Sequence, residues 1–239
     1  MNELTHVLND PGKSLPGRTE LLSADFDRDG LQAALRESSL AIIPSSDGEI
    51  STVSQSGDPN DNSRQTGFFD LHQDGLYYPT APHFLLLYCE DAGRGDSPTV
   101  VADTRPVVEE IDRRPDLQVL REVELVYRGK SGDEHSHPLL ESHPLTKWRV
   151  LNLGARAYVR SFVKSEPPGA GATLREVVSA MAEVFRLLDG AVVRRHFWKK
   201  GDILLIDNHT FVHGREAKSL DFQRKLLRVW LSVKDRGQQ

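Results

Sequence analysis

Cysteine is almost absent from this chain of 239 residues, which contains only Cys89. A single cysteine excludes an internal disulfide and a zinc site built from cysteine ligands, so any metal must be held by histidine and carboxylate. The longest uninterrupted apolar run, Phe84 to Cys89, is far shorter than the ~20 residues that a membrane span needs. The segment from Met1 to Asp10 lacks the basic start and apolar stretch of a signal peptide. We therefore expect a cytoplasmic protein without a membrane partner.

An excess of positive charge is also lacking, because 30 Lys and Arg stand against 35 Asp and Glu and give a net charge of −5. Such a chain repels a phosphate backbone unless its basic residues are segregated, so we expect no nucleic-acid partner. Hydrophobic residues make up 38% of the sequence, which is enough to bury a substantial core. No internal repeat or linker-sized polar tract appears, and we predict one domain over residues 1–239.

Short strands separated by turn residues dominate the pattern along the chain. We predict strands at 68–73, 84–90, 98–102, 123–128, 150–153, 203–206 and 225–233, and helices at 29–38, from 103 onward, and from 173 to 190. Many strands with few helices favour a mainly β fold with flanking helices (α+β), in which a sheet closes or packs on itself. The polar segment 44–67 is too long for a simple turn and predicts either an active-site lid or a surface loop.

His72 and Asp74 are the first candidate metal ligands. They lie two residues apart in a predicted strand, so both side chains should point to the same face. A chain with nine histidines and this many acids is expected to contain about one His-x-acid pair by chance, so the pair needs context. The context is a buried apolar strand, 203–206, that runs into an Asp-Asn turn and is followed by His213.

Two arginines share one face of the last predicted strand. With a period of two, Arg224 and Arg228 align with Leu226 and Trp230, while the intervening residues form the opposite face. Buried arginines require anions, which would indicate an anion-binding site. An edge strand with solvated arginines is the alternative.

These elements, in this order, resemble the Fe(II)/2-oxoglutarate oxygenases of the taurine dioxygenase (TauD/TfdA) family. The match includes His72-x-Asp74, a glycine-rich turn ending in Thr99, the paired His137-Pro138 and His143-Pro144, and the block from Gly201 to Arg224. It covers about residues 68–231, and the stretch 196–216 is also similar to the carbapenem synthase and clavaminate synthase branch. The resemblance implies a double-stranded β-helix (jelly-roll, cupin-like) core.

The same resemblance implies roles for six residues. His72, Asp74 and His213 would bind Fe(II) and leave positions open for 2-oxoglutarate and O2. Arg224 and Thr99 would bind the distal carboxylate of 2-oxoglutarate, and Arg228 matches a second active-site arginine that serves the cosubstrate or an acidic substrate. Leu71, His209 and the short chain depart from the family pattern, which bears on the substrate pocket more than on the metal site.

The implied function is oxidation, most often hydroxylation, of an unactivated C–H bond in a small anionic substrate such as an amino acid or a specialised-metabolite intermediate. Arg228 supports a carboxylate on that substrate, because one arginine suffices for the cosubstrate and a buried, unpaired arginine is costly. One alternative is a non-catalytic cupin-like metal-binding protein, which leaves Arg224 and Thr99 unexplained. Another is a zinc hydrolase that uses His135, His137 and His143. The sequence does not distinguish hydroxylation from desaturation, cyclisation or epimerisation.

Overall fold

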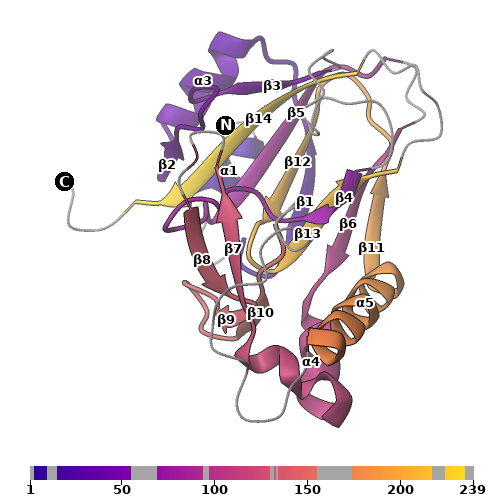
Figure 1. The fold of residues 1–239 in the computed structure, drawn as a ribbon. Helices are drawn as coiled ribbons and strands as arrows, with labels where there is room; N and C mark the ends of the chain where they lie inside the picture. The colour runs from indigo at the N-terminus through magenta and orange to yellow at the C-terminus, as the bar shows by residue number, and fades with distance from the viewer. Residues whose placement is uncertain are drawn as a thin grey trace.

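Two antiparallel sheets form the centre of the molecule (Figure 1). The computed structural model describes residues 3–9, 15–54, 69–93, 97–129, 132, 134–154, 174–216 and 224–234. In the six-stranded sheet the order is β1 (Thr19–Ser23), β12 (Asp202–Asp207), β5 (Phe84–Asp91), β14 (Lys225–Val233) and β2 (Leu40–Ile43), and β3 (Ser51–Val53) also pairs with β14. The four-stranded sheet has the order β11 (Val192–His196), β6 (Thr99–Asp103), β13 (Phe211–Arg215) and β4 (Phe69–His72).

Smaller elements flank the two sheets. Two hairpin-like pairs, β7 (Glu124–Arg128) with β8 (Glu134–Pro138) and β9 (Leu140–Ser142) with β10 (Arg149–Leu151), lie beside them. The helices are α1 (Glu3–Asn9), α3 (Arg28–Arg36), α4 (Arg105–Arg113), the 3-10 helix η2 (Pro115–Glu122) and α5 (Leu174–Gly190). No helix within these described ranges is long and apolar enough to cross a membrane.

Side-chain alternation in the long strands builds separate hydrophobic layers. On β5, Leu85 and Leu87 pack between the two sheets, whereas Phe84 and Leu86 face the layer that also contains buried leucines of α1 and α3. A third layer joins the outer side of the four-stranded sheet to α4, η2 and α5. Both faces of the central strands are therefore buried, which is the sandwich that the strand-rich sequence predicts.

The predicted mainly β, jelly-roll fold class is confirmed. The predicted strand at 225–233 has the bounds of β14, and the predicted helices correspond to α3, α4 and α5. The predicted strand 68–73 is too long, because β4 ends at His72. Thr173, the first residue of the predicted helix 173–190, and residues 94–96 of the glycine-rich turn before Thr99 lie outside the described residues.

The segment 44–67 is not one continuous loop, and the prediction is wrong for its first part. Residues 51–53 form β3, which pairs with β14 in the register Ser51 to Arg228 and Val53 to Leu226. The pairing makes the start of this segment part of the six-stranded sheet. Residues 55–67 lie outside the described part of the chain, so the lid stays a prediction there.

Candidate active site

Three candidate metal ligands converge between the sheets. His72 on β4 is the cross-strand partner of His213 on β13, and their ring centroids are 4.4 Å apart. The ligand atoms of His72, Asp74 and His213 all lie within 4.8 Å of one another, and all three residues are buried. Asp74 follows the end of β4, so the predicted strand alternation is not what brings it to His72. The bend after the strand turns the carboxylate back, and Oδ1 lies 3.5 Å from His72 Nε2.

The charges of these groups suit a divalent metal ion. His72 Nδ1 donates to the carbonyl of Asp70 at 2.8 Å, which places its proton away from Asp74. Burial, together with the nearby His72 and Arg228, lowers the pKa of His213 to about 3, so that its imidazole is neutral. Burial alone would raise the pKa of Asp74, but opposing interactions, of which the charge of the Arg228 guanidinium is the largest, outweigh it and hold the pKa far below its usual range. Neutral imidazoles and an ionised carboxylate are the donor set that non-haem Fe(II) takes.

The turn after β12 holds the backbone around Asp74. Asn208 Oδ1 accepts the N–H of Asp74 at 3.0 Å, and Asn208 Nδ2 donates to the carbonyls of Asp74 at 2.9 Å and Pro82 at 3.0 Å. Gln73 Nε2 donates to the carbonyl of His209 at 2.9 Å. Residues separated by more than a hundred positions in sequence therefore fix the main chain of one candidate ligand.

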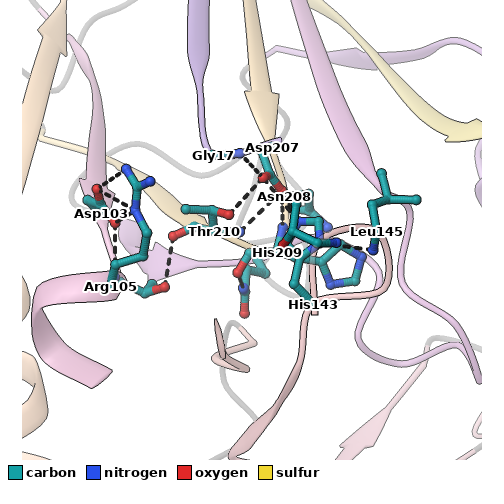
Figure 2. Close-up of polar contacts among 12 residues, drawn as sticks. Gly17, Asp103, Arg105, His143, Leu145, Asp207, Asn208, His209 and Thr210 are labelled. Atoms are coloured by element: carbon teal, nitrogen blue, oxygen red, sulfur yellow. Dashed lines mark hydrogen bonds and ion pairs between the residues drawn. The ribbon is translucent and has the colours of Figure 1, made fainter. Parts of the chain in front are cut away.

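Asp207 is the centre of the polar network that supports this turn (Figure 2). Its carboxylate is buried, and Oδ2 accepts from the N–H of Gly17 at 2.6 Å and from Thr210 Oγ1 at 2.7 Å. Oδ1 accepts the N–H of His209 at 3.0 Å, and His143 Nε2 lies 3.1 Å from Oδ2. The Asp-Asn pair of the sequence motif thus has two structural functions. Asp207 accepts hydrogen bonds that stabilise the turn, and Asn208 forms hydrogen bonds with the backbone of Asp74.

His135, His137 and His143 do not form a metal site, and the zinc-hydrolase alternative is wrong. His137 Nε2 contacts the carbonyl of Tyr78 at 3.0 Å. His143 Nδ1 accepts the N–H of Leu145 at 3.0 Å, while Nε2 faces Asp207. Among the described residues, which include all three histidines, their ring nitrogens are not part of a converging ligand group.

A cavity beside the triad is lined by all the residues that the sequence predicts for the site: His72, Asp74, Thr99, His213, Arg224 and Arg228. The two sheets contribute jointly, because Thr99 and His213 come from the four-stranded sheet and Arg228 comes from β14. Arg215, which the sequence analysis did not select, also lines this cavity.

Arg224 and Thr99 supply donors to the cavity. The Arg224 guanidinium is buried and donates to the carbonyl of Ser97 at 2.7 Å, and no carboxylate in the described ranges forms an ion pair with it. Burial and the neighbouring Arg215 lower its pKa to about 10, so it remains a cation near neutral pH. Thr99 Oγ1 accepts the indole N–H of Trp198 at 3.0 Å, which leaves the hydroxyl proton to donate elsewhere. A guanidinium and a hydroxyl in one cavity fit a carboxylate.

Arg228 forms an ion pair with a carboxylate of the protein, which corrects the sequence-based argument that it is unpaired. Its Nη1 lies 3.3 Å from Asp74 Oδ2, and its Nε donates to Ser51 Oγ at 3.0 Å. The partner is a candidate metal ligand 154 positions away in sequence, so no local pattern could indicate the pairing. Trp230 was also not predicted as a site residue, although its Nε1 donates to the same Asp74 oxygen at 2.8 Å.

The chain is similar in sequence to a known protein family and to curated proteins. A family model described as "Taurine catabolism dioxygenase TauD, TfdA family" matches residues 20–230. The tyrosine isonitrile desaturase of Pseudomonas aeruginosa is 26% identical over 191 residues, which are 75% of this chain and 64% of that protein. The 3-((Z)-2-isocyanoethenyl)-1H-indole synthase of Fischerella ambigua is 26% identical over 179 residues, with coverages of 68% and 63%. The chain therefore spans less than two thirds of the length of these curated relatives.

Solved structures share the fold. PvcB from Pseudomonas aeruginosa, described as an Fe, alpha-ketoglutarate dependent oxygenase from an isonitrile synthetic pathway, aligns with a TM-score of 0.66 and 24% identity over 89% of this chain and 74% of that chain. An asparagine oxygenase in complex with Fe(II), 3-hydroxyasparagine and succinate aligns with a TM-score of 0.69 and 18% identity over 97% and 78%. At these identities the likeness establishes the common fold.

Proposed function

The chain belongs to the taurine catabolism dioxygenase TauD/TfdA family, and from this premise we propose that it is a non-haem Fe(II)- and 2-oxoglutarate-dependent oxygenase. The observation that carries the proposal is the convergence of two histidines and one aspartate at a cavity that also contains a buried arginine without a carboxylate partner among the described residues. Bound iron would couple the oxidative decarboxylation of 2-oxoglutarate by O2 to the oxidation of a substrate C–H bond.

The predicted site residues that line the cavity have different proposed roles. His72, Asp74 and His213 would hold the iron through two imidazole nitrogens and one carboxylate oxygen. Arg224 offers two parallel N–H donors that match the distal carboxylate of 2-oxoglutarate, and the Thr99 hydroxyl donates to the same group. The inter-sheet hydrophobic layer beside this site would limit the access of water to a bound metal.

For the substrate, we propose a small amino acid or a molecule derived from one that keeps its carboxylate. The names of the relatives support this class, because one is a tyrosine isonitrile desaturase and a structural neighbour is an asparagine oxygenase. Arg228 lines the cavity and uses Nε and Nη1 for Ser51 and Asp74. Its Nη2 amino group has no hydrogen-bond partner in the described part of the chain and is available to a substrate carboxylate. The single-domain organisation and the cytoplasmic location stay predictions.

The proposal is tested by succinate release from the purified protein with Fe(II), 2-oxoglutarate and O2. A panel of free amino acids, N-substituted amino acids and their methyl esters is added one at a time, with the His213→Ala protein as the control. We expect one class of free acid to stimulate succinate release and to gain oxygen or lose hydrogen, and we expect no release from the control. Tight metal binding without 2-oxoglutarate turnover on any compound would instead support the non-catalytic cupin-like alternative.

A further inference from the structure

The two carboxylate oxygens of Asp74 have different surroundings. Trp230 on β14 is 2% exposed, and its Nε1 donates to Asp74 Oδ2 at 2.8 Å. Arg228 Nη1 approaches the same oxygen at 3.3 Å. The other oxygen, Oδ1, instead faces His72 Nε2 at 3.5 Å. One oxygen is thus held by donors from the six-stranded sheet, and the other points to a second candidate metal ligand.

The direction of the Trp230 N–H is fixed by packing of its ring. Tyr77 and Tyr78 meet the indole edge-on, with ring centroids 6.1 Å and 5.8 Å away, and the Arg228 guanidinium carbon lies 5.2 Å from its centroid. An indole has a single N–H and no acceptor, so the orientation of the ring decides where that hydrogen bond goes. Here the packed ring aims it at Asp74 Oδ2.

We propose that Trp230 is a positioning residue that keeps Asp74 a metal ligand through one oxygen only. Carboxylates bind metal ions through one or both oxygens. If Asp74 used both, it would occupy a coordination position that a bidentate 2-oxoacid and O2 require at a site with three protein ligands. The N–H of Trp230 occupies Oδ2 and leaves Oδ1 for the metal. This inference rests on the proposed function, because it takes Asp74 as a metal ligand.

The test uses Co(II) as the probe, because its visible absorption reports the number and geometry of its ligands without turnover. Trp230→Phe removes the N–H and keeps an aromatic ring. We expect it to weaken Co(II) binding by about 10- to 100-fold, the loss that is typical when a group supporting a metal ligand is removed. We also expect the Co(II) spectrum to change as Asp74 becomes free to turn its second oxygen to the metal.

Tyr88→Phe is the matched control. Tyr88 is a fully buried aromatic residue on the adjacent strand β5, but it faces the outer layer, and its hydroxyl contacts the backbone of Phe26. The Tyr88→Phe substitution therefore removes the hydroxyl of a buried aromatic residue that does not contact the site. We expect its Co(II) affinity and spectrum to equal those of the wild type.

A second measurement needs no substitution at Trp230. The chain has three tryptophans, so the indole N–H signals of the ¹⁵N-labelled wild type can be assigned through Trp148→Phe and Trp198→Phe. We expect the Trp230 signal to stay protected from solvent exchange when Zn(II) binds. A Zn(II)-induced loss of protection would show that Asp74 Oδ2 leaves the indole, and it would overturn the proposal.

The outcomes separate this inference from the proposed function. If the wild type binds neither Co(II) nor Zn(II), both are wrong. If the wild type binds Co(II) and folded Trp230→Phe binds it with the same affinity and spectrum, the positioning role is wrong while the metal site stands.

Discussion

Replacing Asp207 with Asn should destabilise the fold measurably, because the Asp207 carboxylate is a buried acceptor for several donors. His143 Nδ1 accepts backbone N–H groups, so the proton on Nε2 faces Asp207, and a neutral imidazole donates to an ionised acid. An Asn side chain keeps one acceptor oxygen and turns an amino group toward the donors of the other, such as the Gly17 N–H at 2.6 Å. A buried donor left without an acceptor costs about 1–3 kcal/mol, and charge-assisted bonds are about twice as strong as neutral ones, so we expect a loss of roughly 2–4 kcal/mol.

Thermal and urea unfolding followed by circular dichroism measure this loss. For a chain of this length each kcal/mol lowers Tm by about 2–4 °C, which gives a decrease of roughly 4–16 °C. The matched control is Asp112→Asn, because the Asp112 side chain is 38% exposed and pairs with Arg121 and Arg149 at the surface. Exposed pairs contribute at most about 1 kcal/mol, so the control should unfold within a few degrees of the wild type.

The pH dependence supplies a second criterion for Asp207. Burial raises the pKa of Asp207, but the hydrogen bonds donated by His143, the Gly17 N–H and the Thr210 hydroxyl lower it by more, so that the net pKa is below its usual value. A carboxyl group with a lowered pKa stabilises the fold above the pKa it has in the unfolded chain, and this stabilisation is lost as the pH falls through the folded-state pKa. The stabilities of the wild type and Asp207→Asn should therefore converge in acid. Equal stability of the two proteins at pH 7, or a difference that grows in acid, would refute this description of the network.

The remaining predictions concern the cavity. His213→Ala should lose Fe(II) binding in equilibrium dialysis, because it removes one of three converging ligands; retained stoichiometric binding would move the metal elsewhere. Arg224→Lys should raise the 2-oxoglutarate KM about 10- to 100-fold while Fe(II) affinity stays the same, because it removes one charge-assisted hydrogen bond of about 1.5–3 kcal/mol; an unchanged KM would assign cosubstrate binding to another residue. Arg228→Gln should raise the KM of the free acid substrate more than that of its methyl ester, and an equal effect on both would show that Arg228 acts only on Asp74 or the cosubstrate.

Alternation along β14 made much of the inter-sheet face predictable from sequence. Leu226 and Trp230 lie in the layer between the sheets, and Arg228 lines the adjacent cavity, as the period of two indicates. Arg224 also lines the cavity, but it precedes β14, and the pairing register shifts between Lys225 and Leu226. The short element β3 was not predictable in this way, because its three residues lie in a polar segment and owe their strand geometry to pairing with β14. Local sequence thus determined the long buried strand, while the edge strand depends on a distant partner.

The candidate ligands could be found from sequence, but their supporting contacts could not. His72, Asp74 and His213 were selected by spacing and context, and the structure brings them together. The ion pair between Arg228 and Asp74 joins residues 154 positions apart, and the Trp230 hydrogen bond depends on how the two sheets pack. Such contacts are products of the tertiary fold, so the pattern around either residue does not indicate them.

The most direct test of the central claim is an anaerobic titration of the Fe(II)-loaded wild-type protein with 2-oxoglutarate, followed by visible absorption. We predict a weak charge-transfer band that saturates at one 2-oxoglutarate per chain and is absent from the His213→Ala protein, because the chelate forms only on iron held at the cavity by His72, Asp74 and His213. Stoichiometric Fe(II) binding without any band on addition of 2-oxoglutarate, or the same band in His213→Ala, would contradict the account.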